Sequence, residues 1–234
     1  MTDTQRDRLA ENLHFAVVVS ANAEWRVVKQ LFTKEPIETS PYGEYLFADI
    51  DRERVLFFQG GWGKVAAAGS TQYVIDHFHP ARLINLGTCG GVEGRIQRFD
   101  VVALEKVIIY DIVEAIGESK EAIAEYSTWL RLPDQLPVPA VRATMYSADR
   151  DLTAAGLREL DAQYQPVVVD WESGAIAWVA HRNVTPVLIL RGVTDLVSPD
   201  RAEAQGDLQL FQNHTGRVMQ NLVADLPKWL AAWR

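Results

Sequence analysis

The sequence predicts a single α/β domain, in which strands and helices alternate along the chain and pack in layers. Short apolar runs rich in β-branched residues are separated by longer segments whose apolar residues recur at helical spacing. The length of 234 residues fits one domain of this kind. A composition with 48% hydrophobic and 23% charged residues allows a large buried core.

Charge and cysteine content limit the partners and the location of the protein. The formal charge of −8 argues against nucleic acid or an anionic membrane as the main partner. The single cysteine, Cys89, excludes an intrachain disulfide and fits a reducing compartment. Residues 1–12 lack an apolar centre of the signal-peptide type, and we expect them to be an extension before a domain at residues 13–234. No apolar run is long enough to span a bilayer, so we expect a cytoplasmic protein.

The first half of the chain supplies most of the predicted strands. Trp25, Val28 and Leu31 share one face of a helix, and an alanine-rich segment that begins at Lys64 predicts another. Glycines at residues 60–63 indicate a loop before that second helix. Strands are expected at residues 14–19, 45–50, 54–59, 83–86 and 100–110, and helices at residues 24–32 and 64–78.

The second half contains the least regular segment and the most regular one. Residues 114–139 have mixed charges and three prolines, and the one element expected there is a helix around residues 118–130. The apolar runs at residues 167–169 and 187–190 predict strands on either side of a helix. The remaining expected elements are a strand at residues 141–147, a helix at residues 153–164, and one long amphipathic helix or two at residues 204–233.

Two acids follow the strands of this strand–helix–strand unit. Glu172 comes just after the first apolar run and Asp195 just after the second. Because ligands in open α/β sheets bind outside the carboxyl ends of strands, the two carboxylates form a site hypothesis. The alternative is equally open: Asp170 or Glu172 caps the helix, and Asp195 lies in a turn.

Two glycine-rich segments are further candidates for ligand contact. Residues 60–64 fit neither the dinucleotide nor the phosphate-loop spacing, which favours a tight turn. Residues 87–91 are interpreted as a glycine-rich strand exit, where Thr88 could hydrogen-bond a small ligand or the glycines could only reverse the chain. Cys89 has no histidine partner nearby, so we expect a packed residue rather than a nucleophile.

The histidines give no sign of a metal centre, and the tryptophans indicate packing. His77 and His79 are two residues apart and cannot share a helical face, so no metal site and no cofactor are expected. Trp178, Trp229 and Trp233 lie on predicted amphipathic helices and are interpreted as core or subunit-interface residues.

Four segments in register resemble one family, the 5′-methylthioadenosine/S-adenosylhomocysteine nucleosidase branch of the nucleoside phosphorylase superfamily. Residues 61–68 (GWGKVAAA) are similar to its G-x-G-K-x-x-A-A segment, and residues 84–91 (INLGTCGG) to its I-N-x-G-S/T-x-G-G segment. Residues 170–177 (DWESGAIA) are similar to D/E-M-E-x-x-A-I-A, and residues 191–195 (RGVTD) to R-x-x-S-D. The resemblance extends from about His14 into the C-terminal helix.

This resemblance implies a central mixed, barrel-like sheet flanked by helices, a homodimer, and a role for each site residue. Asp195 would protonate or hydrogen-bond purine N7, Glu172 would hold the ribose hydroxyls, and Glu24 would position or deprotonate the attacking water. Thr88 and Arg191 would lie near that water. The remaining residues expected to contact the substrate are Leu152, through its backbone, Cys89 and Gly90.

The residues at two matching positions favour water over phosphate as the nucleophile. Phosphorylases of the superfamily carry arginines there, whereas this chain has Asn85 at the first and a segment ending in Glu24 at the second. A dianion needs cationic donors, and a glutamate would repel it. Two alternatives stay open: a phosphorylase that uses Arg26 or Arg191 for phosphate, and a nucleoside-binding or storage protein that has lost turnover.

Three departures from the family pattern concern the substrate. Trp171 replaces the methionine under the ribose, and Asp151 replaces an aromatic residue that stacks on the base. Trp62 replaces a smaller apolar residue near the 5′ substituent. We therefore expect a site that is narrower at the 5′ end and more polar around the base.

Overall fold

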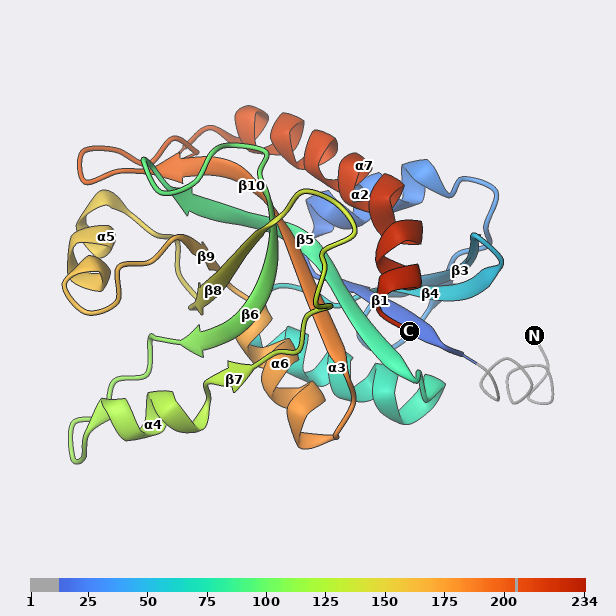
Figure 1. The fold of residues 1–234 in the computed structure, drawn as a ribbon, viewed down its shortest axis with the longest axis horizontal. Helices are drawn as coiled ribbons and strands as arrows, with labels where there is room; N and C mark the ends of the chain where they lie inside the picture. The colour runs from blue at the N-terminus through green and yellow to red at the C-terminus, as the bar shows by residue number, and fades with distance from the viewer. Residues whose placement is uncertain (1–12, 205) are drawn as a thin grey trace.

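The computed structural model describes residues 13–204 and 206–234, and its strands form one mixed sheet (Figure 1). Five strands close on themselves, because β5 pairs β9, β9 pairs β8, β8 pairs β6, β6 pairs β10 and β10 pairs β5 again. These strands are β5 (Arg82–Val92), β6 (Val101–Ile109), β8 (Val141–Ser147), β9 (Val168–Asp170) and β10 (Val187–Val197). The expected α/β fold with a barrel-like mixed sheet is confirmed.

The remaining strands extend the sheet outward from β5. Strand β1 (Phe15–Val19) runs parallel to β5 and to β4 (Glu53–Gln59), and β3 (Glu44–Ile50) and β2 (Glu38–Thr39) follow antiparallel. Every residue of β1 is buried, as expected for a central parallel strand. Its side chains alternate between two hydrophobic clusters, with Phe15, Val17 and Val19 on one face and Ala16 and Val18 on the other.

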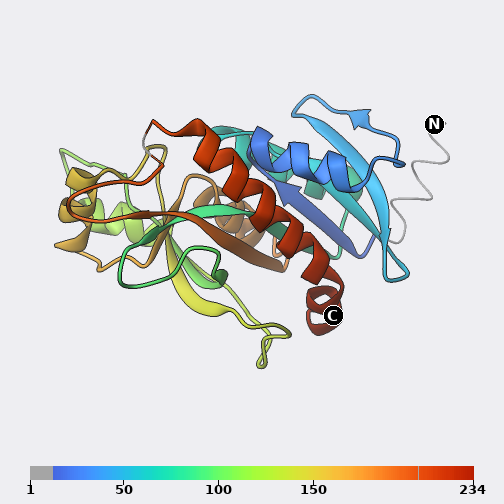
Figure 2. The same cartoon turned by 90° about the horizontal axis from the view of Figure 1, so that it is seen from above.

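Helices cover both faces of this extended sheet. On one face α2 (Asn22–Leu31) packs against α7 (Leu208–Ala232), and Figure 2 shows the two helices side by side. On the other face α3 (Gly63–Phe78) packs against α6 (Ser173–Arg182). Trp229 and Trp233 of the C-terminal segment are buried in the α2–α7 cluster, which confirms their interpretation as core residues.

The two predicted strands that lead into residues 87–91 and into residues 191–195 are longer than the sequence suggested. Residues 87–91 do not leave the sheet; they continue β5 to Val92. Likewise Asp195 does not follow the end of a strand, because β10 continues from Val187 to Val197. Both segments keep their ladder because they pair with each other, and a bulge between Val193 and Asp195 adjusts the register. The glycines at residues 87, 90 and 91 reduce the side-chain volume in these paired strands and do not turn the chain.

The region after β6 also differs from the prediction. The helix expected around residues 118–130 is shorter, since α4 (Ser119–Glu125) ends before β7 (Thr128–Trp129), which pairs with β6. The helix expected at residues 153–164 is the shorter α5 (Ala154–Asp161), and its N-cap is Thr153, whose hydroxyl accepts from the Gly156 amide. None of the described helices combines the length and apolar character needed to cross a bilayer. The N-terminal extension predicted for residues 1–12 lies outside the described residues.

Candidate active site

The glycine-rich half of β5 is where the predicted site residues meet. Glu24 bonds to Thr88, and Asp195 lies opposite Gly90 in the β5–β10 ladder. Gly87 has no side chain because a Cβ there would collide with Arg191 Nη1 and lie 2.9 Å from Glu24 Oε1. Glycine at this position therefore lets two charged groups approach the same piece of backbone.

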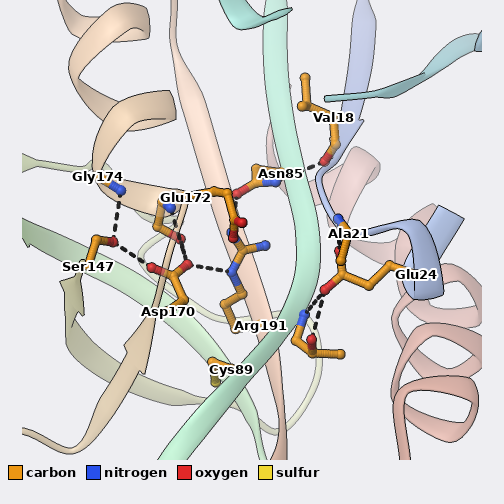
Figure 3. A network of polar contacts seen from close by, with 12 residues as sticks. Val18, Ala21, Glu24, Asn85, Cys89, Ser147, Asp170, Glu172, Gly174 and Arg191 are labelled. Carbon is orange, nitrogen blue, oxygen red and sulfur yellow. Dashed lines mark hydrogen bonds and ion pairs between the residues drawn. The ribbon is translucent and has the colours of Figure 1, made fainter. Parts of the chain in front are cut away.

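Glu24 is fixed by donors from two directions. It is the third residue of α2, where its Oε2 accepts from the backbone amide of the N-cap residue Ala21 at 3.0 Å. Its Oε1 accepts from the Thr88 amide at 2.6 Å and from the Thr88 hydroxyl at 2.8 Å. The residue is only 3% exposed. Figure 3 shows Glu24 beside Ala21 at the start of the helix. The bonds to Ala21 and Thr88 hold the carboxylate in one orientation.

Arg191 is fully buried and is held by two neighbours. Its Nε donates to Asp170 Oδ2 at 3.0 Å, and its Nη2 donates to Asn85 Oδ1 at 2.6 Å (Figure 3). Asn85 in turn donates to the Val18 carbonyl at 2.9 Å, which ties the arginine to β1. Nη1 has no hydrogen-bond partner among the described residues. It borders Gly87, the same glycine that Glu24 approaches.

Glu172 lies at the start of α6 and faces the start of α3. Its Oε1 accepts from the Gly63 amide at 3.0 Å. Burial raises the pKa of Glu172 to about 8, and the nearby negative charge of Asp170 adds to the shift. The Gly63 bond and the Arg191 charge oppose this rise without cancelling it. The raised pKa favours the neutral acid form of Glu172 at neutral pH.

Asp195 lies on β10, next to Thr194, and is partly exposed. The Thr194 hydroxyl donates to its Oδ1 at 2.7 Å. Burial raises the pKa of Asp195, and the charges of Glu203 and Asp151 act in the same direction. A carboxyl group with a raised pKa keeps its proton more readily, which is what a proton donor requires.

The other predicted contact residues surround this group in different ways. Trp62 is 62% exposed and is the N-cap of α3, directly before the Gly63 that binds Glu172. Asp151 is exposed, and its charge acts on Asp195, so it lies on that side of the site. Leu152 and Cys89 are buried, and their side chains pack in hydrophobic clusters. Trp171 is partly exposed between Asp170 and Glu172.

Cys89 is a packing residue, as expected. The thiol is buried, and this burial raises its pKa well above the usual value. A thiol that resists ionisation is a poor nucleophile. Contact of Cys89 and Gly90 with a substrate stays a prediction.

Asp170, which the sequence suggested only as a possible helix cap, has a larger part in the site. Asp170 accepts from Arg191, from the Ser147 hydroxyl, and from both the amide and the hydroxyl of Ser173. Asp170 thus binds the first amide of α6 from two residues before the N-cap residue, Glu172. The role of Glu172 in the site stays a prediction. The sequence feature that could have pointed to Asp170 is its position two residues before Glu172.

A second group missed from the sequence anchors the start of α3. Asp149 Oδ1 accepts from the Lys64 amide at 2.8 Å, and the Lys64 ammonium binds Asp111. The Asp149 amide donates to Asp111 Oδ2 at 3.0 Å, which closes the group. These bonds orient the helix start whose Gly63 amide contacts Glu172. Nothing in the spacing of residues 64, 111 and 149 reveals this contact.

The fold and the site define a class: an α/β protein with a closed five-stranded sheet, in which a buried arginine and several acids line one strand. The chain belongs to the phosphorylase superfamily, whose family model matches residues 15–226. The resemblance stated from the four sequence segments is thereby confirmed.

Individual relatives are similar to this chain over most of its length. A 5′-methylthioadenosine/S-adenosylhomocysteine nucleosidase of Halalkalibacterium halodurans is 28% identical over 195 residues, which cover 77% of this chain and 83% of the relative. One from Anoxybacillus flavithermus is 23% identical over 232 residues, or 92% and 100% of the two chains. The apo structure of an Arabidopsis thaliana 5′-methylthioadenosine nucleosidase superposes with a TM-score of 0.77 at 23% identity, covering 92% and 96%. The Streptococcus pneumoniae nucleosidase with the transition-state inhibitor MT-ImmA gives 0.73 at 21% identity, covering 95% and 100%.

Proposed function

We propose that this protein is an enzyme that hydrolyses the N-glycosidic bond of a purine nucleoside of the 5′-methylthioadenosine or S-adenosylhomocysteine type, with water as nucleophile. The names of its relatives and structural neighbours support the reaction and the substrate class. One observation supports the choice of nucleophile: the carboxylate of Glu24 accepts hydrogen bonds from both the amide and the hydroxyl of Thr88.

Phosphate would find few donors in this arrangement. Thr88 already donates to a carboxylate, and the positive charge of Arg191 is paired with Asp170. Arg26, the other arginine considered, is exposed on α2, whereas Glu24 is buried. An anion next to Glu24 would be repelled by several kcal/mol in a desolvated site, on an order-of-magnitude Coulomb basis. A neutral water molecule avoids that cost.

The three acids suit the three parts of the reaction. Cleavage of an N-glycosidic bond develops positive charge on the sugar and negative charge on the leaving base. Asp195 would protonate the base, and its raised pKa supports this role. Glu172 accepts hydrogen bonds from the ribose hydroxyls, and Glu24 takes a proton from the attacking water. Arg191 Nη1, without a partner among the described residues, would donate to that water.

A homodimer and a cytoplasmic location complete the proposal. Apolar side chains before and after α4 are highly exposed in the single chain: Val113, Ile116 and Trp129 are 89%, 101% and 72% exposed. A second copy of the chain covering them would explain this exposure. The one cysteine is free and buried, which fits a reducing compartment. Light scattering that gives a monomer at working concentration would count against the dimer.

The proposed reaction is tested by measuring release of the free base from a panel of purine nucleosides, with and without phosphate. The panel includes 5′-methylthioadenosine, S-adenosylhomocysteine, adenosine and inosine. Release without phosphate is the expected result. Strict dependence on phosphate would indicate a phosphorylase, and binding without release would indicate a protein that has lost turnover.

A further inference from the structure

The bulge in β10 stands directly before the proposed acid. The ladder with β5 pairs Val193 with Cys89 and resumes with Asp195 opposite Gly90, so that Thr194 has no opposite residue. Thr194 is nevertheless 1% exposed. A buried carbonyl that leaves the ladder needs another hydrogen-bond donor.

His214 on α7 supplies that donor. Its Nδ1 lies 2.6 Å from the Thr194 carbonyl oxygen. Because a carbonyl oxygen can only accept, this nitrogen must carry the hydrogen. The imidazole also packs edge-on against Phe99, with ring centroids 5.0 Å apart. The Phe99 amide donates to the Val193 carbonyl at 2.9 Å. Phe99 and His214, whose rings contact each other, therefore bind the two carbonyls at the bulge, those of Val193 and Thr194.

The orientation of the Thr194 peptide decides where the Thr194 hydroxyl points. That hydroxyl lies 2.7 Å from Asp195 Oδ1 and 3.3 Å from the Cys89 carbonyl oxygen. It has one hydrogen, which it gives to Asp195 when that residue is ionised and to Cys89 when Asp195 holds a proton on Oδ1. If the Thr194 peptide rotated, its hydroxyl could donate neither to Asp195 nor to the Cys89 carbonyl.

We propose that His214 is a positioning residue for Asp195: it holds the Thr194 bulge and thereby aims the carboxyl group at the leaving base. The inference rests on the proposed function, because it takes Asp195 as the acid. Many of the buried side chains of α7 are apolar, and the hydrogen bond from His214 to the Thr194 carbonyl links this helix to the residue beside Asp195.

Two substitutions separate the hydrogen bond from the packing of the ring. His214→Phe keeps a ring against Phe99 and removes the donor. His214→Asn removes the ring and keeps an N–H donor close to the position of Nδ1. Arg217→Met, one turn further along α7, is the matched control, because Arg217 stacks on Phe99 and is not bonded to Thr194.

The readout compares two leaving groups on the same sugar. A purine needs protonation to leave, whereas 4-nitrophenolate leaves readily as an anion. We therefore measure kcat and KM for 5′-methylthioadenosine and for the 4-nitrophenyl glycoside of 5-methylthioribose. His214→Phe should lower kcat on the purine substrate by about tenfold or more and change kcat on the nitrophenyl substrate less than about twofold. His214→Asn should recover most of the purine activity, and Arg217→Met should resemble the wild type.

Three results would overturn the inference. Equal losses on both substrates, or higher purine activity in His214→Phe than in His214→Asn, would assign His214 to packing alone. Wild-type purine turnover in His214→Phe would remove any role for the hydrogen bond. No base release by the wild-type protein would overturn the proposed function, and this inference with it.

Discussion

Arg191 and Asp170 form an ion pair that is almost completely buried, with Nε 3.0 Å from Oδ2 and the two side chains 1% and 3% exposed. Removing Asp170 would leave a buried guanidinium without its counter-charge. Asp170→Ala should therefore lower the free energy of unfolding by about 3–5 kcal/mol, measured by urea denaturation. The control is Asp49→Ala, which breaks the exposed pair with Arg54 and should cost less than about 1 kcal/mol. Similar costs for the two variants would contradict the importance of the buried pair.

Asp195→Asn tests the general acid. The amide keeps the shape and can still accept from Thr194, so the fold should be retained. Turnover of a purine nucleoside should fall by about two orders of magnitude or more, the usual scale for a positioned acid. Steady-state kinetics with 5′-methylthioadenosine provide the measurement, and near wild-type turnover would refute the assignment.

Glu172→Gln tests contact with the sugar. A carboxylate can accept from both ribose hydroxyls, and an amide accepts at only one of its two positions. The variant should therefore weaken a nucleoside with both hydroxyls more than its 2′-deoxy analogue, as kcat/KM for each will show. Equal losses for both substrates would speak against the role.

The raised pKa of Glu172 predicts how stability changes with pH. The folded protein keeps this proton up to about pH 8, whereas the unfolded chain loses it near the ordinary value of 4.5. Between these values the folded state binds more protons, so the residue's contribution to stability falls as pH rises. The stability of Glu172→Gln relative to the wild type should thus increase from pH 5 to pH 8.5 in urea unfolding. A difference that does not change with pH would contradict the shift.

Much of the fold was predictable because local patterns and packing agree. Continuous apolar runs such as β1 and amphipathic helices such as α2 appear at the expected places. The errors occur where tertiary pairing overrides local signals. Residues 87–91 suggest a turn until β10 is placed beside them, and Asp195 lies inside a strand because β10 pairs with those glycines.

The acids of the site were predictable, but the residues that orient them were not. Glu24, Glu172 and Asp195 lie near the ends of elements and in family motifs, so sequence alone could suggest them. Their partners come from remote positions: the bond between Gly63 and Glu172 joins residues 109 positions apart, and Asn85 and Arg191 are 106 apart. His214 has no signal in the sequence, because its contact is made to a backbone carbonyl, which leaves no pattern in side-chain types.

The identity of the sugar product tests the choice of nucleophile most directly. The wild-type enzyme is incubated with 5′-methylthioadenosine in millimolar phosphate, and the products are followed by ³¹P and ¹H NMR. Glu24→Gln serves as the control, since it should lose most of the turnover and still bind the substrate. Attack by water should give free 5-methylthioribose and adenine at a rate that phosphate does not change. Formation of 5-methylthioribose 1-phosphate would contradict it and make the protein a phosphorylase.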